Sequence, residues 1–418
     1  MHRFLYQHIP IEMKLLHAFS DIDPHQWQSL MERSPYATWF QTPEAYRFYA
    51  SNPEEMMPFV FAVAEEAKGT DNQCEIESVQ CKGTENGETD IPASRLIASS
   101  PYRLKAVCVG YITRERSALK QFFTRRAIII GGPLLAEGIN DGELSALLNA
   151  VKSMPILNPS LKGRTSNTMK LSSFPLGEGR GEAYNSPSFR KGLGVGLPIY
   201  IETRNFHDYS KWRHIFEQCG FAYQPHLNIQ VACSAAHTMS EQRQRQVKKA
   251  IKNGAEIYEA LSEQEIRDWY QILRQLYRQK VRTPLWSEAF FLQFYRNGVG
   301  KYLLVKYNGK VIGGMMCPIF AGKAIYEWYI CGLDEAYREQ YPSVMATYAA
   351  IEYGKQNGIR MFDFMGAGVP DKPYGVRDFK MEFDGEVVEY GRYLCVRKPL
   401  LYKIGKWGVK WLKRSINK

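Results

Sequence analysis

The segment from residue 301 to residue 331 most constrains what this chain can fold into. It contains three apolar runs separated by two short turns: Lys301–Tyr307, Asn308-Gly309, Lys310–Phe320, Ala321-Gly322 and Lys323–Cys331. An Asn-Gly pair between two apolar runs is a strong hairpin signal, because both central residues of that turn adopt positive φ angles. The segment therefore predicts three consecutive antiparallel strands.

Strand and helix patterns surround this meander. A strand at Tyr223–Cys233 and three helices at Ser240–Asn253, Ser262–Gln279 and Ser287–Asn297 are predicted before the meander. A helix at Pro342–Gln356 and two strands at Arg360–Met365 and Val387–Val396 are predicted after it. This order predicts an α+β domain in which the meander passes into a β-α-β unit. A Rossmann fingerprint, a P-loop and a Ser/His/Asp spacing are absent from the sequence.

The first half of the chain shows a similar order of elements. Its helices are predicted at 24–34, 43–51 and 141–152, and its strands at 57–65, 104–114, 126–135 and 197–204. A length of 418 residues also suits two domains. We therefore predict two tandem domains, residues 1–222 and 223–396, each with a mixed, mostly antiparallel sheet flanked by helices. A tail follows at 397–418.

Two polar segments are predicted to be disordered inserts in the first domain. Residues 68–103 are rich in Gly, Thr, Asn, Glu and Ser, and residues 154–196 are rich in Gly, Ser, Pro and Asn. Neither has a sustained hydrophobic period, which is typical of segments that cannot bury a core. The stretch Gly177-Glu-Gly-Arg-Gly181 is interpreted as linker, because no strand precedes it and no Lys-Ser or Lys-Thr follows.

The net charge of +11 is concentrated in two places. The tail from Arg397 to Lys418 holds eight basic residues and no acidic residue, and the second insert holds six basic and two acidic residues. The rest of the chain is close to neutral. A general nucleic-acid platform needs a broad cationic face, so the composition disfavours that class.

The tail itself is predicted to form a basic amphipathic helix. Its apolar residues fall near one helical face and basic residues border them: Leu400, Leu401, Ile404, Trp407, Trp411, Leu412, and Lys403, Lys406, Lys410, Lys413, Arg414. Such a helix lies on anionic membrane surfaces. The alternative is a helix docked on the protein's own core.

The eight cysteines show no C-x-x-C pair and no spacing to histidine that would suit a metal site. Several lie in apolar strand-like runs, which predicts reduced buried thiols. No apolar run approaches the ~18 residues of a membrane span, and the first residues lack a signal-peptide core. We expect a cytoplasmic protein that binds no metal and contacts the inner membrane face through its tail.

Four segments in order resemble the Fem family, the aminoacyl transferases that extend peptidoglycan stem peptides, and its FemAB-like relatives. They are Thr38-Trp-Phe-Gln-Thr-Pro43, Arg245-Gln-Val-Lys-Lys-Ala-Ile-Lys-Asn-Gly254, Tyr341-Pro342 opening a helix that leads to Gly358-Ile-Arg-Met-Phe-Asp-Phe364, and Tyr374-Gly-Val-Arg-Asp-Phe-Lys-Met-Glu-Phe383. The resemblance spans most of residues 15–395 outside the inserts. It implies two domains of the GNAT acyltransferase fold, which agrees with the doubled pattern.

The resemblance leaves the acyl donor open. GNAT enzymes hold the pyrophosphate of acyl-CoA on a Gly-rich turn at the start of the helix that follows the meander. The corresponding segment here, Arg338-Glu-Gln-Tyr-Pro-Ser343, has no glycine and includes a proline, which lacks an N–H. This departure fits Fem-type proteins, whose donor is an aminoacyl-tRNA. The region 262–297 is too short for the coiled-coil arm of many Fem enzymes, so the transferred amino acid stays open.

Candidate site residues come from this alignment of motifs and from local patterns. Lys380 and Asp363 are the predicted catalytic residues, with Lys380 stabilising an oxyanion and Asp363 accepting a proton. The predicted substrate-binding residues are Arg377, Tyr374, Arg245, Lys249, Lys252 and Tyr329. Arg245, Lys249 and Lys252 share one helical face that suits a diphosphate or a tRNA backbone, although a solvated basic helix explains them equally well. Likewise, the alternative for Asp363 is a carboxylate that caps a loop at a strand end, and either face of the strand with Tyr329 suits the core.

These observations predict an acyltransferase that moves an aminoacyl group from aminoacyl-tRNA to an amine of a cell-wall or lipid-linked precursor. Two alternatives remain at this point. One is an acyl-CoA-dependent N-acyltransferase for an amino sugar of surface polysaccharide. The other is a catalytically silent protein that binds a lipid-linked precursor. For either enzyme the tRNA or CoA is a co-substrate and no cofactor stays bound.

Overall fold

The computed structural model describes residues 13–66, 102–114, 125–154, 197–234, 236 and 238–415, with side chains described up to residue 407. Residues 68–101 and 155–196, which make up nearly all of the two predicted inserts, lie outside the described residues. Tyr102 and Arg103 were assigned to an insert from the sequence, but they open a strand. Apolar residues recur from Tyr102 onward and join the buried strand.

The first sheet is built from strands of the first half and one strand from the end of the chain. In spatial order it runs β1 (Met13–Leu16), β2 (Met56–Glu66), β3 (Tyr102–Thr113), β4 (Arg126–Gly131), β6 (Tyr200–Asn205), β16 (Arg392–Val396) and β7 (Ala222–Gln224), with β5 (Leu134–Leu135) beside β3. Most neighbours are antiparallel, and β4 and β6 are parallel.

The second sheet has a comparable order. It runs β15 (Glu386–Val388), β8 (Asn228–Ala232), β14 (Met361–Asp363), β12 (Ala324–Tyr326), β11 (Lys310–Phe320), β10 (Gly300–Tyr307) and β9 (Ala255–Glu259), with β13 (Tyr329–Gly332) beside β11. The predicted meander is confirmed as β10, β11 and β12–β13, and Asn308 and Gly309 both have positive φ at its first turn. The parallel pair is β12 and β14.

Each parallel pair is joined by one helix, so the two halves repeat one design. Helix α4 (Asp141–Ser153) lies between β4 and β6 in sequence, and α9 (Pro342–Gln356) lies between β12 and β14. A capping box starts α4: Asn140 accepts a hydrogen bond from the Glu143 N–H, and the Glu143 carboxylate accepts one from the Asn140 N–H. The expected α+β fold with two related sheets is confirmed.

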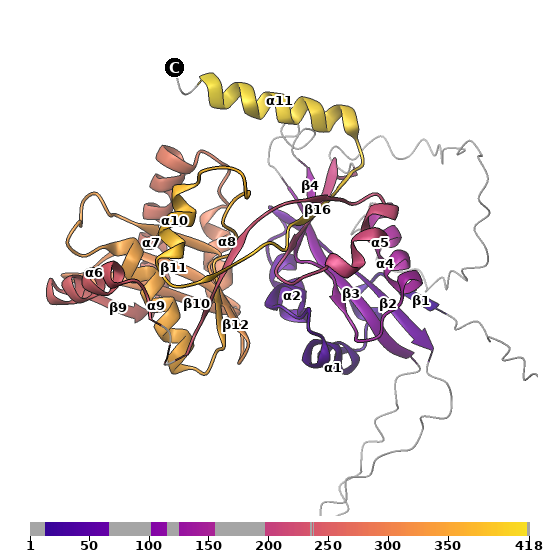
Figure 1. Cartoon of the computed structure of the whole chain (residues 1–418), viewed down its shortest axis with the longest axis horizontal. Coiled ribbons are helices and arrows are strands. Elements are labelled where there is room, and N and C mark those ends of the chain that lie inside the picture. Colours follow the sequence, from indigo (N-terminus) through magenta and orange to yellow (C-terminus); the bar gives the residue numbers. More distant parts are fainter. Residues whose placement is uncertain are drawn as a thin grey trace, which may run out of the picture.

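The two sheets enclose a shared layer of helices (Figure 1). Along β2, alternate residues face opposite sides, as a strand requires. Phe59 and Phe61 pack with α4 and α5 (Arg213–Gln218), whereas Val60 and Ala62 face α1 (Pro24–Arg33) and α2 (Pro43–Ala50). The same alternation in β10 separates α7 (Glu263–Leu276) and α8 (Glu288–Arg296) from α6 (Glu241–Lys252) and α9. One core cluster therefore extends across both halves.

An aromatic seam forms the centre of this shared layer. The ring of Trp328 lies 5.3 to 6.2 Å from five rings of the two halves: Trp39, Phe40, Phe48, Phe290 and Phe294. Trp39 and Phe40 belong to the Thr-Trp-Phe-Gln motif, which forms a short 3-10 helix. Aromatic rings bury large apolar areas and add edge-to-face contacts, so this motif fastens the two halves together.

The predicted strand Val387–Val396 is wrong in one respect. The structure divides it into β15, which pairs with β8 of the second sheet, and β16, which pairs with β6 of the first sheet. Gly391 lies between them with a φ of 63°, and a Cβ there would lie 2.2 Å from the Tyr223 ring. The sequence signal is continuous in hydrophobicity, whereas this glycine lets the backbone turn from one sheet to the other.

Gln41 offers a test of the seam. Its side-chain amide donates to the carbonyl of Gly132 at 2.6 Å, and its carbonyl oxygen accepts the Thr38 N–H at 2.8 Å, all in the buried core. We expect Gln41→Leu to lower the free energy of unfolding by about 2–4 kcal/mol, because two buried polar groups lose their partners. Urea unfolding measures this.

The matched control is Gln28→Leu on the exposed side of α1, where a change within about 0.5 kcal/mol is expected. Equal stability of Gln41→Leu and the parent protein would contradict the role assigned to the buried amide.

Candidate active site

The candidate active site lies where the parallel strands of the second sheet end. β12 and β14 pair as far as Tyr326 and Asp363, and the Glu327 N–H then donates to the Asp363 carbonyl at 2.9 Å. The chain next joins β13, which pairs with β11. Glu327 and Trp328 therefore occupy a break in the strand, beside the carboxyl end of β14. Ligands of open sheets commonly lie at such ends.

Asp363 is fully buried and held by three donors. The Asn228 amide donates to both carboxylate oxygens at 2.8 Å, the Gln230 amide donates at 2.9 Å, and the Met365 N–H donates at 2.7 Å. Burial raises the pKa of Asp363, and these hydrogen bonds oppose the rise. The carboxylate joins β8, β14 and the loop that follows, which matches the loop-capping alternative for this residue.

Lys380 is also buried, and its ammonium has three oxygen partners. It lies 2.8 Å from the Glu327 carboxylate and donates at 2.9 Å to the carbonyls of Phe364 and Gly366. An ammonium has three N–H donors, so each is used. Lys380 therefore acts in this conformation as a positioning residue that connects Glu327 with the loop after β14. To make the predicted contact with an oxyanion, Lys380 would have to give up one of these three contacts.

Lys380 lies in a helix that precedes the last two strands. Residues Gly375–Met381 form helix α10, which Tyr374 precedes as the N-cap residue. Charged and apolar residues alternate around Phe379, as they would in a strand, but Phe379 and Phe383 are four residues apart and pack together at 5.4 Å. This i, i+4 contact is a helical spacing, and it outweighs the short alternating pattern.

Arg377 organises the loop between β14 and α10. Its guanidinium donates to the carbonyls of Ala367, Val369, Pro370 and Lys372. The loop is strained at its start, where Met365 has a φ of 55°, a conformation that costs energy for a non-glycine residue. The structure thus brings Arg377 to the edge of the site as a scaffold of the loop. Its predicted contact with a substrate phosphate stays a prediction.

Tyr374 and Tyr329 lie on opposite sides of the break. Tyr374 is exposed and covers Gly368, whose added Cβ would lie 3.0 Å from the ring. Tyr329 is half-buried and contacts Phe291 at 5.1 Å and Tyr277 at 6.3 Å. Burial raises the pKa of Tyr329 well above its ordinary value, so its hydroxyl stays protonated at neutral pH.

The predicted basic face lies on α6, and its contacts are at the surface. Arg245 pairs with Glu241 of the same helix at 4.0 Å, and Lys249 pairs with Glu339, just before α9, at 3.1 Å. Lys252 is exposed near the end of the helix. These contacts match a solvated basic helix, which was the alternative interpretation, and they link none of the three residues to Asp363 or Lys380.

Glu327 is the functional candidate that the site predictions missed. It is 8% exposed, and the second oxygen of its carboxylate, Oε2, has no hydrogen-bond partner among the residues that the structure describes. Burial raises the pKa of Glu327, and the Lys380 ammonium limits that rise. A carboxylate with an unused oxygen and a raised pKa suits a general base. The only signal in the sequence was a charged residue inside the aromatic run Tyr326–Tyr329.

A narrow pocket opens between the two sheets next to this network. Its lining includes Arg204, Phe206, His226, Asn228, Gly366 and Arg392. Glu202 lies 2.6 Å from Arg392 and 3.4 Å from Arg204, so two cations share one carboxylate. His226 accepts a hydrogen bond from Arg392 at 2.8 Å, and burial together with Arg392 lowers the pKa of His226 to about 4. The pocket is cationic and borders the Asp363 network through Asn228.

The N-terminus of α9 is closed by a carboxylate. Pro342 occupies the first turn, the Ser343 N–H donates to Asp334 at 3.0 Å, and the Met345 N–H donates to the Tyr341 carbonyl. Tyr341 has a φ of 43°. Among the described residues, no cluster of three or more His, Cys, Asp or Glu side chains suits a metal ion, and no helix has the length and apolar character of a membrane span.

Comparison with known proteins found one family model, and it matches part of the second half. A family model for an acetyltransferase (GNAT) domain matches residues 241–381, from α6 through α10. The match includes Glu327, Asp363 and Lys380. A comparison with curated proteins gave no match.

The fold likeness to FemX covers both halves, and two further solved structures match with lower scores. FemX has a TM-score of 0.57 with this chain at 11% identity, and the match covers 93% of this chain and 99% of that chain. L-PGS from Bacillus licheniformis has a TM-score of 0.46 at 11% identity, covering 92% and 96%. A protein of unknown function from Bacteroides thetaiotaomicron has a TM-score of 0.45 at 8% identity, covering 91% and 100%.

The likeness to FemX shows the fold of the whole chain, and the domain model adds the type of chemistry. Both agree with the repeated β-α-β design and with the network at the end of its parallel strands. The protein is an acyltransferase with an acetyltransferase-type (GNAT) domain at residues 241–381 and an overall fold similar to that of FemX.

Proposed function

We propose that this acyltransferase moves an aminoacyl group from aminoacyl-tRNA to an amine of a cell-wall precursor. The observation that carries the choice of donor is the closed N-terminus of α9. A helix N-terminus binds the pyrophosphate of CoA through unpaired N–H groups. Here Pro342 has no N–H, and the Ser343 N–H is already paired with the carboxylate of Asp334. A pyrophosphate would meet a negative charge at this position.

The chemistry requires a base and a pocket for the acceptor. The amine attacks the ester carbonyl and loses a proton, the bond to the tRNA ribose oxygen breaks, and that oxygen takes up a proton to become a hydroxyl. Glu327 is the group proposed to take that proton through Oε2, while Lys380 holds its other oxygen. Arg204 and Arg392 would attract an anionic group of the acceptor, and the adjacent pocket, with about 10 Å³ of accessible space, would have to widen to admit it. The resemblance of the four sequence motifs to the Fem family supports the same acceptor class.

A donor screen tests this function. Purified protein is incubated with a pool of labelled aminoacyl-tRNAs and a peptidoglycan precursor, and the product is identified by mass spectrometry. We expect transfer from aminoacyl-tRNA. The family model is named for an acetyltransferase, so acyl-CoA is the second candidate, and acetyl-CoA is run in parallel. Transfer from acetyl-CoA alone would replace the proposed donor, and absence of transfer from any donor would overturn the function.

Glu327→Gln tests the proposed base. We expect kcat to fall by about 100-fold or more, because general base catalysis contributes about that much, with little change in KM. In the parent enzyme kcat/KM should rise as pH rises through the pKa of Glu327, which burial holds above its ordinary value. The variant should lose this acidic limb.

The control is Glu44→Gln, which removes an exposed carboxylate paired with Arg47 and should leave kcat unchanged. Circular dichroism checks that both variants are folded. Full activity of Glu327→Gln would assign the proton transfer to another group.

We also propose that the tail places the enzyme on an anionic membrane, where a lipid-linked acceptor would be found. Helix α11 (Pro399–Ser415) lies at the outside of the molecule (Figure 1). Leu400, Ile404 and Trp407 follow an i, i+4, i+7 spacing and are 76%, 52% and 69% exposed. Tyr402, on the other side of the helix, packs against Tyr200 at 5.3 Å. One face of α11 therefore contacts the rest of the protein, and its apolar face is exposed.

Truncation after Lys398 tests the membrane contact. We expect the parent protein to sediment with phosphatidylglycerol vesicles, because apolar burial adds to roughly 1 kcal/mol per basic residue near the surface. Truncated protein should remain in the supernatant while keeping its melting temperature. Phosphatidylcholine vesicles are the control, to which binding should be weak. Equal sedimentation of truncated and full-length protein would contradict the proposal.

A further inference from the structure

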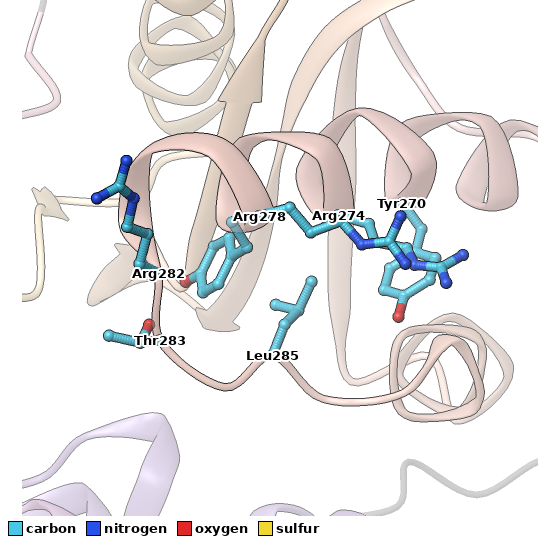
Figure 2. A pocket seen from close by; sticks show the side chains of 7 residues that line it. Tyr270, Arg274, Arg278, Arg282, Thr283 and Leu285 are labelled. Atoms are coloured by element: carbon cyan, nitrogen blue, oxygen red, sulfur yellow. The ribbon is translucent and has the colours of Figure 1, made fainter. Parts of the chain in front are cut away.

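A cleft of about 600 Å³ lies at the end of α7, outside the candidate active site. Figure 2 shows the side chains that line it, among them Tyr270, Arg274, Tyr277, Arg278, Arg282 and Leu285. The helix forms one wall, and the returning loop with Leu285 forms the opposite wall. No residue of this cleft belongs to the site predictions or to the network around Asp363.

A helical irregularity gives the cleft its shape. The last turn after α7 is a π-helix, Tyr277–Val281, and Arg282 ends it with a φ of 55°. A single π-turn inside or at the end of an α-helix often occurs at functional sites, because it widens the helix and redirects side chains. Here it turns the chain back on itself, so that the loop faces the same side of α7 as the arginines.

The guanidinium groups of Arg274 and Arg278 have no hydrogen-bond or ion-pair partner among the described residues, whereas that of Arg282 has one. Arg282 donates to the Gln279 carbonyl, and in Figure 2 its guanidinium is directed away from the other two. Arg274 and Arg278 extend toward Tyr270, and their side chains form no hydrogen bond or ion pair with any residue that the structure describes. Like charges at i, i+4 repel each other. An anion held by both would remove that repulsion.

The acidic residues near the cleft already have partners. Glu288 lies 3.3 Å from Arg267, and Glu55 accepts the Ser287 N–H at 2.6 Å. Burial raises the pKa of Tyr270; Arg274 and Arg278 oppose that rise, and the two carboxylates add to it. The cleft therefore keeps a net positive charge that these side chains do not neutralise.

The aromatic residues connect the cleft with the candidate active site. Tyr277 lines the cleft, and its ring lies 6.3 Å from that of Tyr329. Tyr329 follows Glu327 by two residues along the chain. Tyr329 therefore links a ring that lines the cleft with the chain segment that carries Glu327.

We propose that this cleft binds the phosphate groups of the nucleotide part of the acyl donor. Guanidinium groups bind phosphate oxygens with two parallel hydrogen bonds, and tyrosine rings provide stacking surfaces for bases. The proposal rests on the acyltransferase function for the link to the donor. The phosphodiesters at the 3′ end of a tRNA and the phosphates of CoA share this chemistry, so the probes below distinguish them.

Binding is measured directly, without turnover, by titration of the full chain. The probes are the trinucleotide CCA, adenosine 3′,5′-bisphosphate and inorganic pyrophosphate. The double variant Arg274→Gln, Arg278→Gln should weaken binding of the preferred probe by at least about 10-fold. For CCA, the slope of log K against log salt concentration should also become less negative by about 1.4, because two contacts to single-stranded phosphates are lost. The control Arg33→Gln, Arg103→Gln removes two exposed arginines of the first half and should change neither value.

The outcomes separate the cleft from the proposed function. Preferential loss of CCA binding in the double variant supports the cleft with an RNA donor, and preferential loss of adenosine bisphosphate binding supports it with a CoA donor. If the probes bind at the cleft and no donor supports transfer, the binding proposal is supported and the proposed function is contradicted. Unchanged binding in the double variant, or no binding of any probe to the parent protein, would overturn the cleft proposal whatever the activity assay shows.

Discussion

Two consecutive residues at the strand break, Glu327 and Trp328, determine how the molecule is held together. Their side chains have different partners. Trp328 enters the aromatic seam between the halves, and Glu327 enters the network with Lys380 and Asp363. A displacement of the break would disturb both at once. The packing of the two sheets and the geometry of the candidate site therefore depend on the same two residues.

The buried ion pair is better understood as a positioning device than as a source of stability. Taking two charges out of water costs about as much as their attraction returns, whereas removing only one partner leaves the other unpaired and costs roughly 3–5 kcal/mol. Lys380 also binds two carbonyls of the strained loop after β14. This arrangement fixes one oxygen of Glu327 and leaves the other available, which is what a base at a strand end needs.

The sequence was sufficient for the repeated order of elements, because Asn308-Gly309, the helix caps and the apolar runs are local signals. It also named Asp363, Arg377 and Lys380 as candidate site residues. It could not assign their partners. That Arg377 binds four carbonyls, or that Lys380 faces Glu327, depends on how α10 packs against β12 and β14. Likewise, the turn at Gly391 is determined by contact with Tyr223, which is 168 residues away in sequence. The cleft at α7 depends on a π-turn that no local sequence signal marks.

The placement of β16 has a consequence for the order of folding during synthesis. β7 pairs with β16, and Gln224 lies directly opposite Arg392 in that ladder. The whole second sheet lies between these two residues in the chain. Domains usually fold as units, with the N-terminal one first as the chain leaves the ribosome. Here the first sheet lacks a strand until residue 396 has been made, so the second sheet can close first, and the half that is translated first is the last to be completed.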